Sequence, residues 1–258
     1  MNSMDPRTSS QDLQTAIWRA LMYTFLGRSL AYPSQEHQAV LRDRIVPILS
    51  KLELDAESGE GLREALRGVD VPLEEMRAAY TAVFTLTVSA DCPDYETAYD
   101  SRDVFQQAHA MADIAGFYRA YGLQAGGLEY QRPDHISTEL EFMSFLAFKE
   151  AYAIEHCGQH EVEVTREAQS LFLRDHVGCW GPAFGRRVQA RAGGDDSFYA
   201  AVGGLLTDWL IDECDQLNVT PARSMEEPQL DWPEPDDGAC GAEGDCPLIG
   251  IDEISVAR

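Results

Sequence analysis

The chain has 258 residues, with 20 Lys and Arg against 44 Asp and Glu, so its formal net charge is −24 when histidine is neutral. A surface of this kind repels a polyanion, and the sequence has no cluster of Lys and Arg that could neutralise several phosphates, so we expect no nucleic-acid partner. Hydrophobic residues make up 45% of the chain, which is enough for a real core in one large domain or two small ones.

The basic residues are almost all arginine, because Lys51 and Lys149 are the only lysines. An excess of carboxylates suits a salty cytoplasm, since the Debye length falls to ~3 Å in molar salt and the mutual repulsion of the carboxylates is then screened. An ordinary acidic protein of a mesophilic host fits the same composition equally well, so a halophilic origin is one of two open interpretations.

Almost every periodic segment has the spacing of an α-helix, and proline and glycine set the expected boundaries. The helices predicted in the first part of the chain are 10–32, 34–49 with a kink or break at Pro47, a short one at 62–66, and 72–86. Residues 87–100 form the least helical stretch of the expected core.

The second part of the chain contains the strongest helix, which we expect to run from Asp134, its N-cap, to about His156. Apolar residues cover more than half of its circumference, so it should be central in the fold. The other helices predicted here are 101–122, 161–176, 182–191 and 197–217. No segment alternates as a strand does, so we expect an all-α protein with a single domain of about nine helices in residues 1–219.

The composition changes after Val219, where prolines and acidic residues become frequent. Such a segment cannot bury enough apolar surface to offset the entropy of ordering it. We therefore expect residues 220–258 to form a flexible, acidic, Pro-rich tail, and we expect the fold to survive deletion of this tail.

The start of the chain is polar and lacks the features of a secretory signal, and no uncharged run is long enough to span a bilayer. These features predict a cytoplasmic protein without stable membrane association. The six cysteines show no CxxC spacing, and thiols in a reducing compartment are usually free. Cys240 and Cys246 leave open one rival hypothesis, a metal- or iron–sulfur-binding assembly protein that uses these tail cysteines.

Motifs that carry chemistry are scarce, because the sequence contains no phosphate-binding loop, zinc-protease motif or hydrolase elbow. His135 and Glu139 are four residues apart on one helical face, with Asp134 beside them at the positive end of the helix dipole. A small-molecule enzyme that uses these three residues is a second rival hypothesis. A capped helix with a surface ion pair is the simpler interpretation. Glu141 follows Glu139 by two residues and should point away from it, so these two do not form an acid–base pair.

Residues 132–143 read RPDHISTELEFM and resemble the D-H-x-x-x-E-L-x-F-M signature of the TorD/DmsD/NarJ family, the all-helical chaperones that mature molybdenum redox enzymes. Three further segments are similar to the family in its own order: 23–33, 80–84, and the F-x-x-x-H-x-x-x-W-x-x-x-F pattern of 172–184. The resemblance covers about residues 15–217. Residues 92–97 and 112–118 look like the branch that serves type II dimethyl sulfoxide reductase-like enzymes.

This resemblance implies a TorD-like bundle that is not an enzyme. It implies a chaperone that binds the twin-arginine N-terminal signal region of a molybdenum oxidoreductase catalytic subunit and holds it for cofactor insertion, assembly and export. It also implies a monomer or a domain-swapped dimer, and a protein that carries no cofactor, although it allows a transient contact with the molybdenum cofactor.

A basic peptide with an apolar core needs a carboxylate-rich rim beside aromatic side chains. Carboxylates of this kind lie next to aromatic residues in the sequence, as Asp94, Glu96 and Asp100 do beside Tyr95 and Tyr99. We expect at least half of these aromatics to pack in the core instead. We expect Asp134 to meet a peptide guanidinium directly. The predicted peptide-binding residues are Tyr80, Phe84, Tyr95, Glu96, Tyr99, Arg102, Phe105, Arg132, Asp134, His135 and Glu139.

Overall fold

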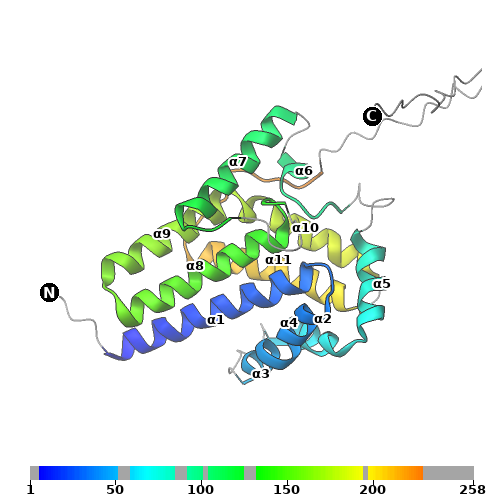
Figure 1. Ribbon diagram of the computed structural model, residues 1–258, viewed down its shortest axis with the longest axis horizontal. Coiled ribbons are helices and arrows are strands. Elements are labelled where there is room, and N and C mark those ends of the chain that lie inside the picture. Colours follow the sequence, from blue (N-terminus) through cyan, green and yellow to red (C-terminus); the bar gives the residue numbers. More distant parts are fainter. Residues whose placement is uncertain are drawn as a thin grey trace, which may run out of the picture.

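A computed structural model describes residues 6–51, 59–84, 92–100, 104–124, 132–193 and 197–228 of the chain. Every regular element in these ranges is helical, which confirms the all-α prediction (Figure 1). None of the helices in these ranges is both long enough and apolar enough to cross a bilayer. The elements are α1 (Pro6–Leu30), α2 (Gln35–Val40), the π-helical turn η1 (Leu41–Ile45), α3 (Val46–Leu49), α4 (Gly59–Arg67), the 3₁₀ turn η2 (Gly68–Asp70), α5 (Leu73–Phe84), α6 (Thr97–Asp100), α7 (Val104–Ala120), α8 (Ile136–His156), α9 (Gln159–Asp175), α10 (Val177–Ala192) and α11 (Phe198–Gln216).

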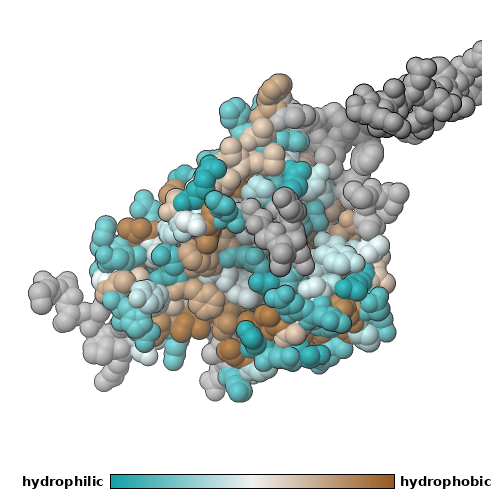
Figure 2. Space-filling view, viewed as in Figure 1, coloured by the Kyte–Doolittle hydropathy of each residue, from teal (hydrophilic) through white to brown (hydrophobic). Residues whose placement is uncertain are grey.

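Helix α8 lies antiparallel along α1, and this pair forms the middle of the molecule. The apolar residues that surround α8 explain its position, because Leu140, Met143 and Leu146 are all completely buried. A polar contact also joins the two helices, since the hydroxyl oxygens of Thr24 and Ser144 are 2.7 Å apart. Figure 2 shows apolar side chains gathered over this pair, on a face that is otherwise largely hydrophilic.

Helices α10 and α11 form a second tightly packed pair, in which glycine allows the two backbones to approach each other. A Cβ atom at Gly203 would lie only 2.6 Å from the carbonyl oxygen of Gly185. Helix α10 begins at Val177, five residues before the predicted start, because Pro182 is accommodated inside the helix. Helix α10 also contacts loop 92–100, since the ring centroids of Tyr99 and Trp180 are 5.2 Å apart.

The predicted break at Pro47 is confirmed and takes the form of a π-helical turn. Proline has no N–H, so residue 47 cannot donate to the carbonyl four residues earlier. The chain widens just before it, and the N–H of Val46 donates to the carbonyl of Leu41, five residues back. Helix α2 therefore ends at Val40 and the chain continues as α3.

Helix α7 projects from the body and packs mainly through its C-terminal part (Figure 1). Ile114 and Tyr118 are buried, whereas Phe105 in its first turn is 81% exposed. Gly122 ends the turn that follows, with a φ of 72°, as its position in the sequence predicts.

Residues 220–228 pack against α9 and α10, although we placed them in the flexible tail; we call this segment the strap. The backbone N–H of Ala222 donates to the carbonyl of Arg174 at 2.7 Å, and that of Met225 donates to Cys179 at 3.1 Å. The side chain of Met225 is 6% exposed. The packed body therefore continues past the expected boundary at 219, since Met225 supplies an apolar side chain to bury. Residues 229–258, with Cys240 and Cys246, lie outside the described residues, so the rest of the tail stays a prediction.

Candidate functional site

Within the signature segment, His135 caps α8 in place of the expected Asp134. The Nδ1 atom of His135 accepts a hydrogen bond from the backbone N–H of Ser137 at 3.1 Å. Nδ1 must therefore be unprotonated, so the ring proton lies on Nε2 and faces the Asp94 carboxylate at 3.2 Å. The cap thus fixes the orientation of the imidazole and joins α8 to loop 92–100.

Asp134 is completely buried and connects segment 132–135 to loop 92–100. Both of its oxygens accept from the Arg132 guanidinium at 2.9 Å, and the Thr97 hydroxyl donates to it at 2.7 Å. Burial alone would raise the pKa of Asp134, but the hydrogen bonds from Arg132 and Thr97 and the charge of Arg132 outweigh burial and hold the pKa below its usual value. A peptide guanidinium could reach this carboxylate only by displacing Arg132, which differs from the direct contact that we expected.

The backbones of loop 92–100 and segment 132–135 are also joined. Tyr95 and His135 form an isolated antiparallel bridge. The N–H of Glu96 donates to the carbonyl of Asp134 at 2.8 Å, and the N–H of Ile136 donates to the carbonyl of Asp94 at 2.9 Å. We call these two segments the paired loops. Because they are held by backbone and side-chain bonds together, they form one fixed surface.

A buried acidic cluster lies beneath the paired loops. Glu96 and Glu139 are completely buried, and His176 is 2% exposed. The Nδ1 atom of His176 is 3.2 Å from a Glu96 carboxylate oxygen, and the indole N–H of Trp180 donates to Glu139 at 3.1 Å. Burial is the main factor that raises the pKa of Glu139 well above its usual value, and the charge of Glu96 adds to it.

The simple interpretation of Glu139 as a surface ion pair is therefore wrong, because the side chain lies in the core. Glu141 does point away from it, as predicted, and pairs with Arg28 at 3.2 Å on the exposed side of α8. The site also includes His176 and Trp180, which the predicted set omits. The i, i+4, i+8 spacing of Phe172, His176 and Trp180 was the signal that could have placed them on one face with the cluster.

The outer face of the paired loops carries carboxylates and one aromatic ring. The Asp94 and Asp100 side chains are 24% and 16% exposed. The Arg132 guanidinium lies over the Tyr95 ring, 4.2 Å from its centroid. Asp113 of α7 is 71% exposed and is 3.6 Å from Nε2 of His176. The described rim is therefore acidic, and the exposed Arg132 beside it is already paired with Asp134.

The other predicted aromatics divide between core and surface. Phe84 is 8% exposed and stacks on Phe184, and Tyr99 is 2% exposed and lies 5.2 Å from Trp180 between ring centroids. Tyr80 is partly buried, and its hydroxyl donates to Asp94 at 3.4 Å. Phe105 lies apart in the first turn of α7, and Arg102 lies outside the described residues. The expectation that at least half of these rings pack in the core agrees with the burial of Phe84, Tyr99 and much of Tyr80.

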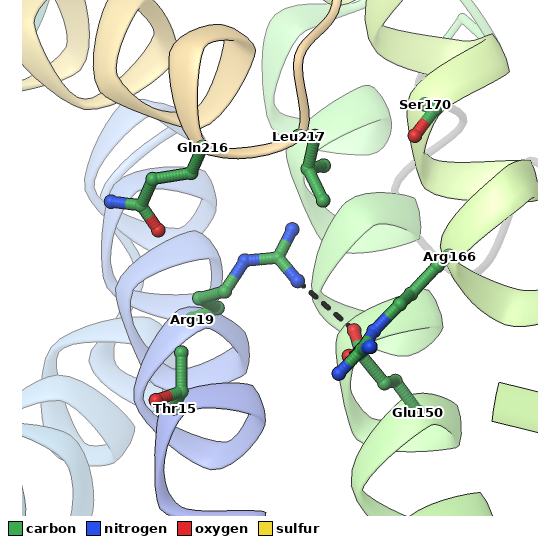
Figure 3. Close-up of a pocket in the computed structure, with 7 residues that line it drawn as sticks. All are labelled: Thr15, Arg19, Glu150, Arg166, Ser170, Gln216 and Leu217. Carbon is green, nitrogen blue, oxygen red and sulfur yellow. Dashed lines mark hydrogen bonds and ion pairs between the residues drawn. The ribbon is translucent and has the colours of Figure 1, made fainter. Parts of the chain in front are cut away.

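A second polar site, which the sequence did not reveal, lies between α1, α8, α9 and α11 (Figure 3). It surrounds Arg19, which is 4% exposed and donates two hydrogen bonds to Glu213, at 2.7 and 2.6 Å, and one to Glu150, at 3.0 Å. An adjoining cavity of about 330 Å³ is lined by Thr15, Arg19, Glu150, Arg166, Ser170, Gln216 and Leu217. Arg166 also donates to Glu150, at 2.5 Å, so the positive charges are balanced by carboxylates. This cluster ties four helices together, and we assign it a structural role.

No group of three His, Cys, Asp or Glu residues in the described part of the chain could hold a metal ion. His156 and His160 are exposed on either side of the break between α8 and α9. Cys157, Cys179 and Cys214 are free thiols. The rival metal hypothesis depends on Cys240 and Cys246, which lie outside the described residues.

Comparison with known proteins gives consistent matches. The family model described as nitrate reductase delta subunit matches residues 51–186, which is more than half of the chain. The selenate reductase assembly chaperone protein of Thauera selenatis is 30% identical over 158 residues, 58% of this chain and 76% of that protein. The perchlorate reductase assembly chaperone protein of Dechloromonas aromatica is 25% identical over 197 residues, 74% of this chain and 87% of that protein.

The chaperone protein TorD of Photobacterium profundum is 29% identical over 133 residues, 51% of this chain and 59% of that protein. The narrower resemblance to the branch that serves type II dimethyl sulfoxide reductase-like enzymes stays a prediction. The relatives are named as chaperones, and their family is not enzymatic, which confirms the expectation for this chain and removes the small-molecule enzyme hypothesis. The chain belongs to the nitrate reductase delta subunit family, within the TorD/NarJ group of molybdoenzyme chaperones.

Proposed function

We propose that the chain binds the N-terminal signal region of a molybdenum oxidoreductase catalytic subunit, in which paired arginines precede an apolar run, and holds that subunit in the cytoplasm until the cofactor is inserted. The names of the relatives support a reductase as the client. The protein needs no cofactor of its own for this task, and any contact with the molybdenum cofactor is transient.

The observation that carries the proposal is the acidic outer face of the paired loops. Loop 92–100 and segment 132–135 are held to each other by hydrogen bonds of Asp134, His135 and Glu96. The carboxylate of Asp94 and the ring of Tyr95 are therefore presented in one orientation. Peptide guanidinium groups pair best with carboxylates that are already held in place, because less side-chain entropy is then lost on binding. In this proposal Asp134 and Glu139 position the loops, and Asp94, Tyr95 and Asp100 contact the peptide.

Calorimetry on the full chain tests this function. The probe is a synthetic peptide with two adjacent arginines followed by an apolar run of leucine and alanine, and the reference peptide has alanine in place of both arginines. We expect the chain to bind the first peptide at least about tenfold more tightly, since a partly desolvated carboxylate–guanidinium contact contributes ~1.5–3 kcal/mol.

The Asp94→Asn variant should bind the paired-arginine peptide about fivefold or more weakly, because one rim charge is lost. Glu141→Gln is the control: this carboxylate is exposed too, but it lies on α8 and pairs with Arg28 of α1, away from the paired loops, so binding should not change. Equal affinity for the two peptides, or equal effects of the two substitutions, would contradict the proposal.

A further inference from the structure

The strap is held against the body in the way that a bound peptide is held. Its backbone donates at two positions, from Ala222 to Arg174 and from Met225 to Cys179, and the Met225 side chain is buried. Main-chain hydrogen bonds together with a pocket for one apolar side chain are the usual means by which a protein captures a peptide segment. The strap has no regular secondary structure of its own.

Arg223 lies between these two backbone contacts and reaches the candidate site. One end of its guanidinium donates to the carboxylate of Asp100, at the end of α6, and the other donates to the carbonyl of Asp175 at 3.4 Å. That carbonyl belongs to the last residue of α9, where the helix dipole favours a positive charge. Asp100 and the helix end therefore form a position that accepts an arginine.

The position is continuous with the outer face of the paired loops. Asp100 ends the loop that carries Asp94 and Tyr95, and the neighbouring His176 joins the end of α9 to Glu96 of that same loop. The order Arg223-Ser224-Met225 places an apolar side chain two residues after an arginine. This segment therefore resembles the ligand proposed above, because a basic residue is followed by an apolar one.

We propose that the strap is an internal competitor of the client: Arg223 occupies an arginine-accepting position on Asp100, and an arginine-containing peptide must displace the strap in order to bind fully. This inference rests on the proposed function, because its competitor is the basic N-terminal region of the client. It means that client binding releases the segment that follows α11. It also means that the apparent affinity is reduced by the fraction of molecules whose strap is docked.

Calorimetry with the two peptides described above tests the competition, now with the Arg223→Ala variant of the full chain. Loss of the internal competitor should tighten binding of the paired-arginine peptide by about three- to tenfold, because more molecules then have an open site. Arg63→Ala is the matched control. Its side chain is 48% exposed against 47% for Arg223 and pairs with Glu60 on α4, away from the strap, so affinity should be that of the parent chain.

Hydrogen exchange gives a second readout that does not depend on affinity. The backbone amides of Ala222 and Met225 should exchange faster when the parent chain is saturated with the paired-arginine peptide, because their bonds to Arg174 and Cys179 open. The alanine reference peptide at the same concentration should leave their exchange unchanged.

The outcomes separate the two proposals. If the parent chain binds the paired-arginine peptide but Arg223→Ala binds it no more tightly and the two amides stay protected, the strap is not a competitor, and the proposed function stands. If neither chain prefers the paired-arginine peptide, the proposed function is wrong and the inference is wrong with it. Tighter binding by Arg223→Ala with faster exchange at both amides supports the competition.

Discussion

Glu139 shows how burial changes the chemistry of a single carboxyl group. It lies under the paired loops, accepts a hydrogen bond from Trp180 and has Glu96 as a charged neighbour. Burial and that neighbour raise its pKa above the value of an unfolded chain, so the folded state holds this proton more tightly than the unfolded state does. Its contribution to stability is therefore complete at low pH and is lost as the pH rises through the folded-state pKa.

We expect the Glu139→Gln variant to remove this dependence, because an amide is a neutral isostere that can still accept from Trp180. The difference in free energy of unfolding between variant and parent should grow in favour of the variant as the pH rises above about 4.5, by up to ~1.4 kcal/mol per pH unit until the folded-state pKa is passed. Urea unfolding from pH 4 to pH 8 measures this difference.

Glu141→Gln, two residues further along α8, is the control. Its side chain is exposed and paired with Arg28, so its difference from the parent should stay within ~0.5 kcal/mol across the range. A constant difference for Glu139→Gln as well would show that folding does not raise the pKa of this carboxyl.

The sequence predicts the helix face on which a side chain lies better than it predicts how deeply that side chain is buried. The helical period correctly separates Glu139 from Glu141, because residues two apart point in nearly opposite directions. It cannot show that Glu139 is buried, since this depends on Glu96 and His176, which are 80 residues apart in the chain. The N-cap prediction for Asp134 is wrong for a similar reason. Aspartate is a preferred N-cap residue, but here Arg132 and Thr97 donate to its carboxylate.

At the scale of elements, the long helices are predictable because each one buries a stripe of apolar residues and ends at glycine, at proline or at a polar cap. Helix α11 was expected at 197–217 and runs from Phe198 to Gln216. Irregular segments are harder to predict, because their structure comes from distant partners. The strap is such a case, since its backbone is held by the carbonyls of Arg174 and Cys179.

Truncation measures the strap's contribution to stability. A chain that ends at Pro228 should unfold with a free energy within ~0.5 kcal/mol of the parent, because the residues removed have the composition of a solvated tail. A chain that ends at Val219 should lose about 2 kcal/mol, since the burial of Met225 is lost. Denaturant unfolding of the three chains compares these values.

Met225→Ala in the full chain is the control for this comparison and should reproduce most of the larger loss. Equal stability of all three chains would mean that the strap contributes nothing and that the boundary belongs at residue 219, as the composition suggested.

For the whole molecule, the net charge of −24 is the dominant feature. The buried pairs of Arg19 with Glu150 and Glu213 are sheltered from salt, whereas the carboxylates on the surface repel one another through solvent. Added salt should therefore weaken the repulsion more than it weakens the interactions that hold the core together.

We expect the midpoint of thermal unfolding to rise by several degrees between low and molar KCl, because salt screens the repulsion among the 44 acidic residues. Circular dichroism at 222 nm follows the loss of the helices. A midpoint that stays constant or falls would exclude adaptation to a salty cytoplasm and leave the ordinary acidic protein as the interpretation.

The close contact between Gly185 and Gly203 has a consequence for genetic screens. Helix α10 carries Trp180 and begins directly after His176. The position of these two site residues therefore depends on how α10 packs against α11 at the two glycines. A screen for lost chaperone activity will recover substitutions at Gly185 and Gly203, because any side chain there forces the two helices apart. Such substitutions will have the same phenotype as substitutions in the paired loops, although neither glycine belongs to the candidate site.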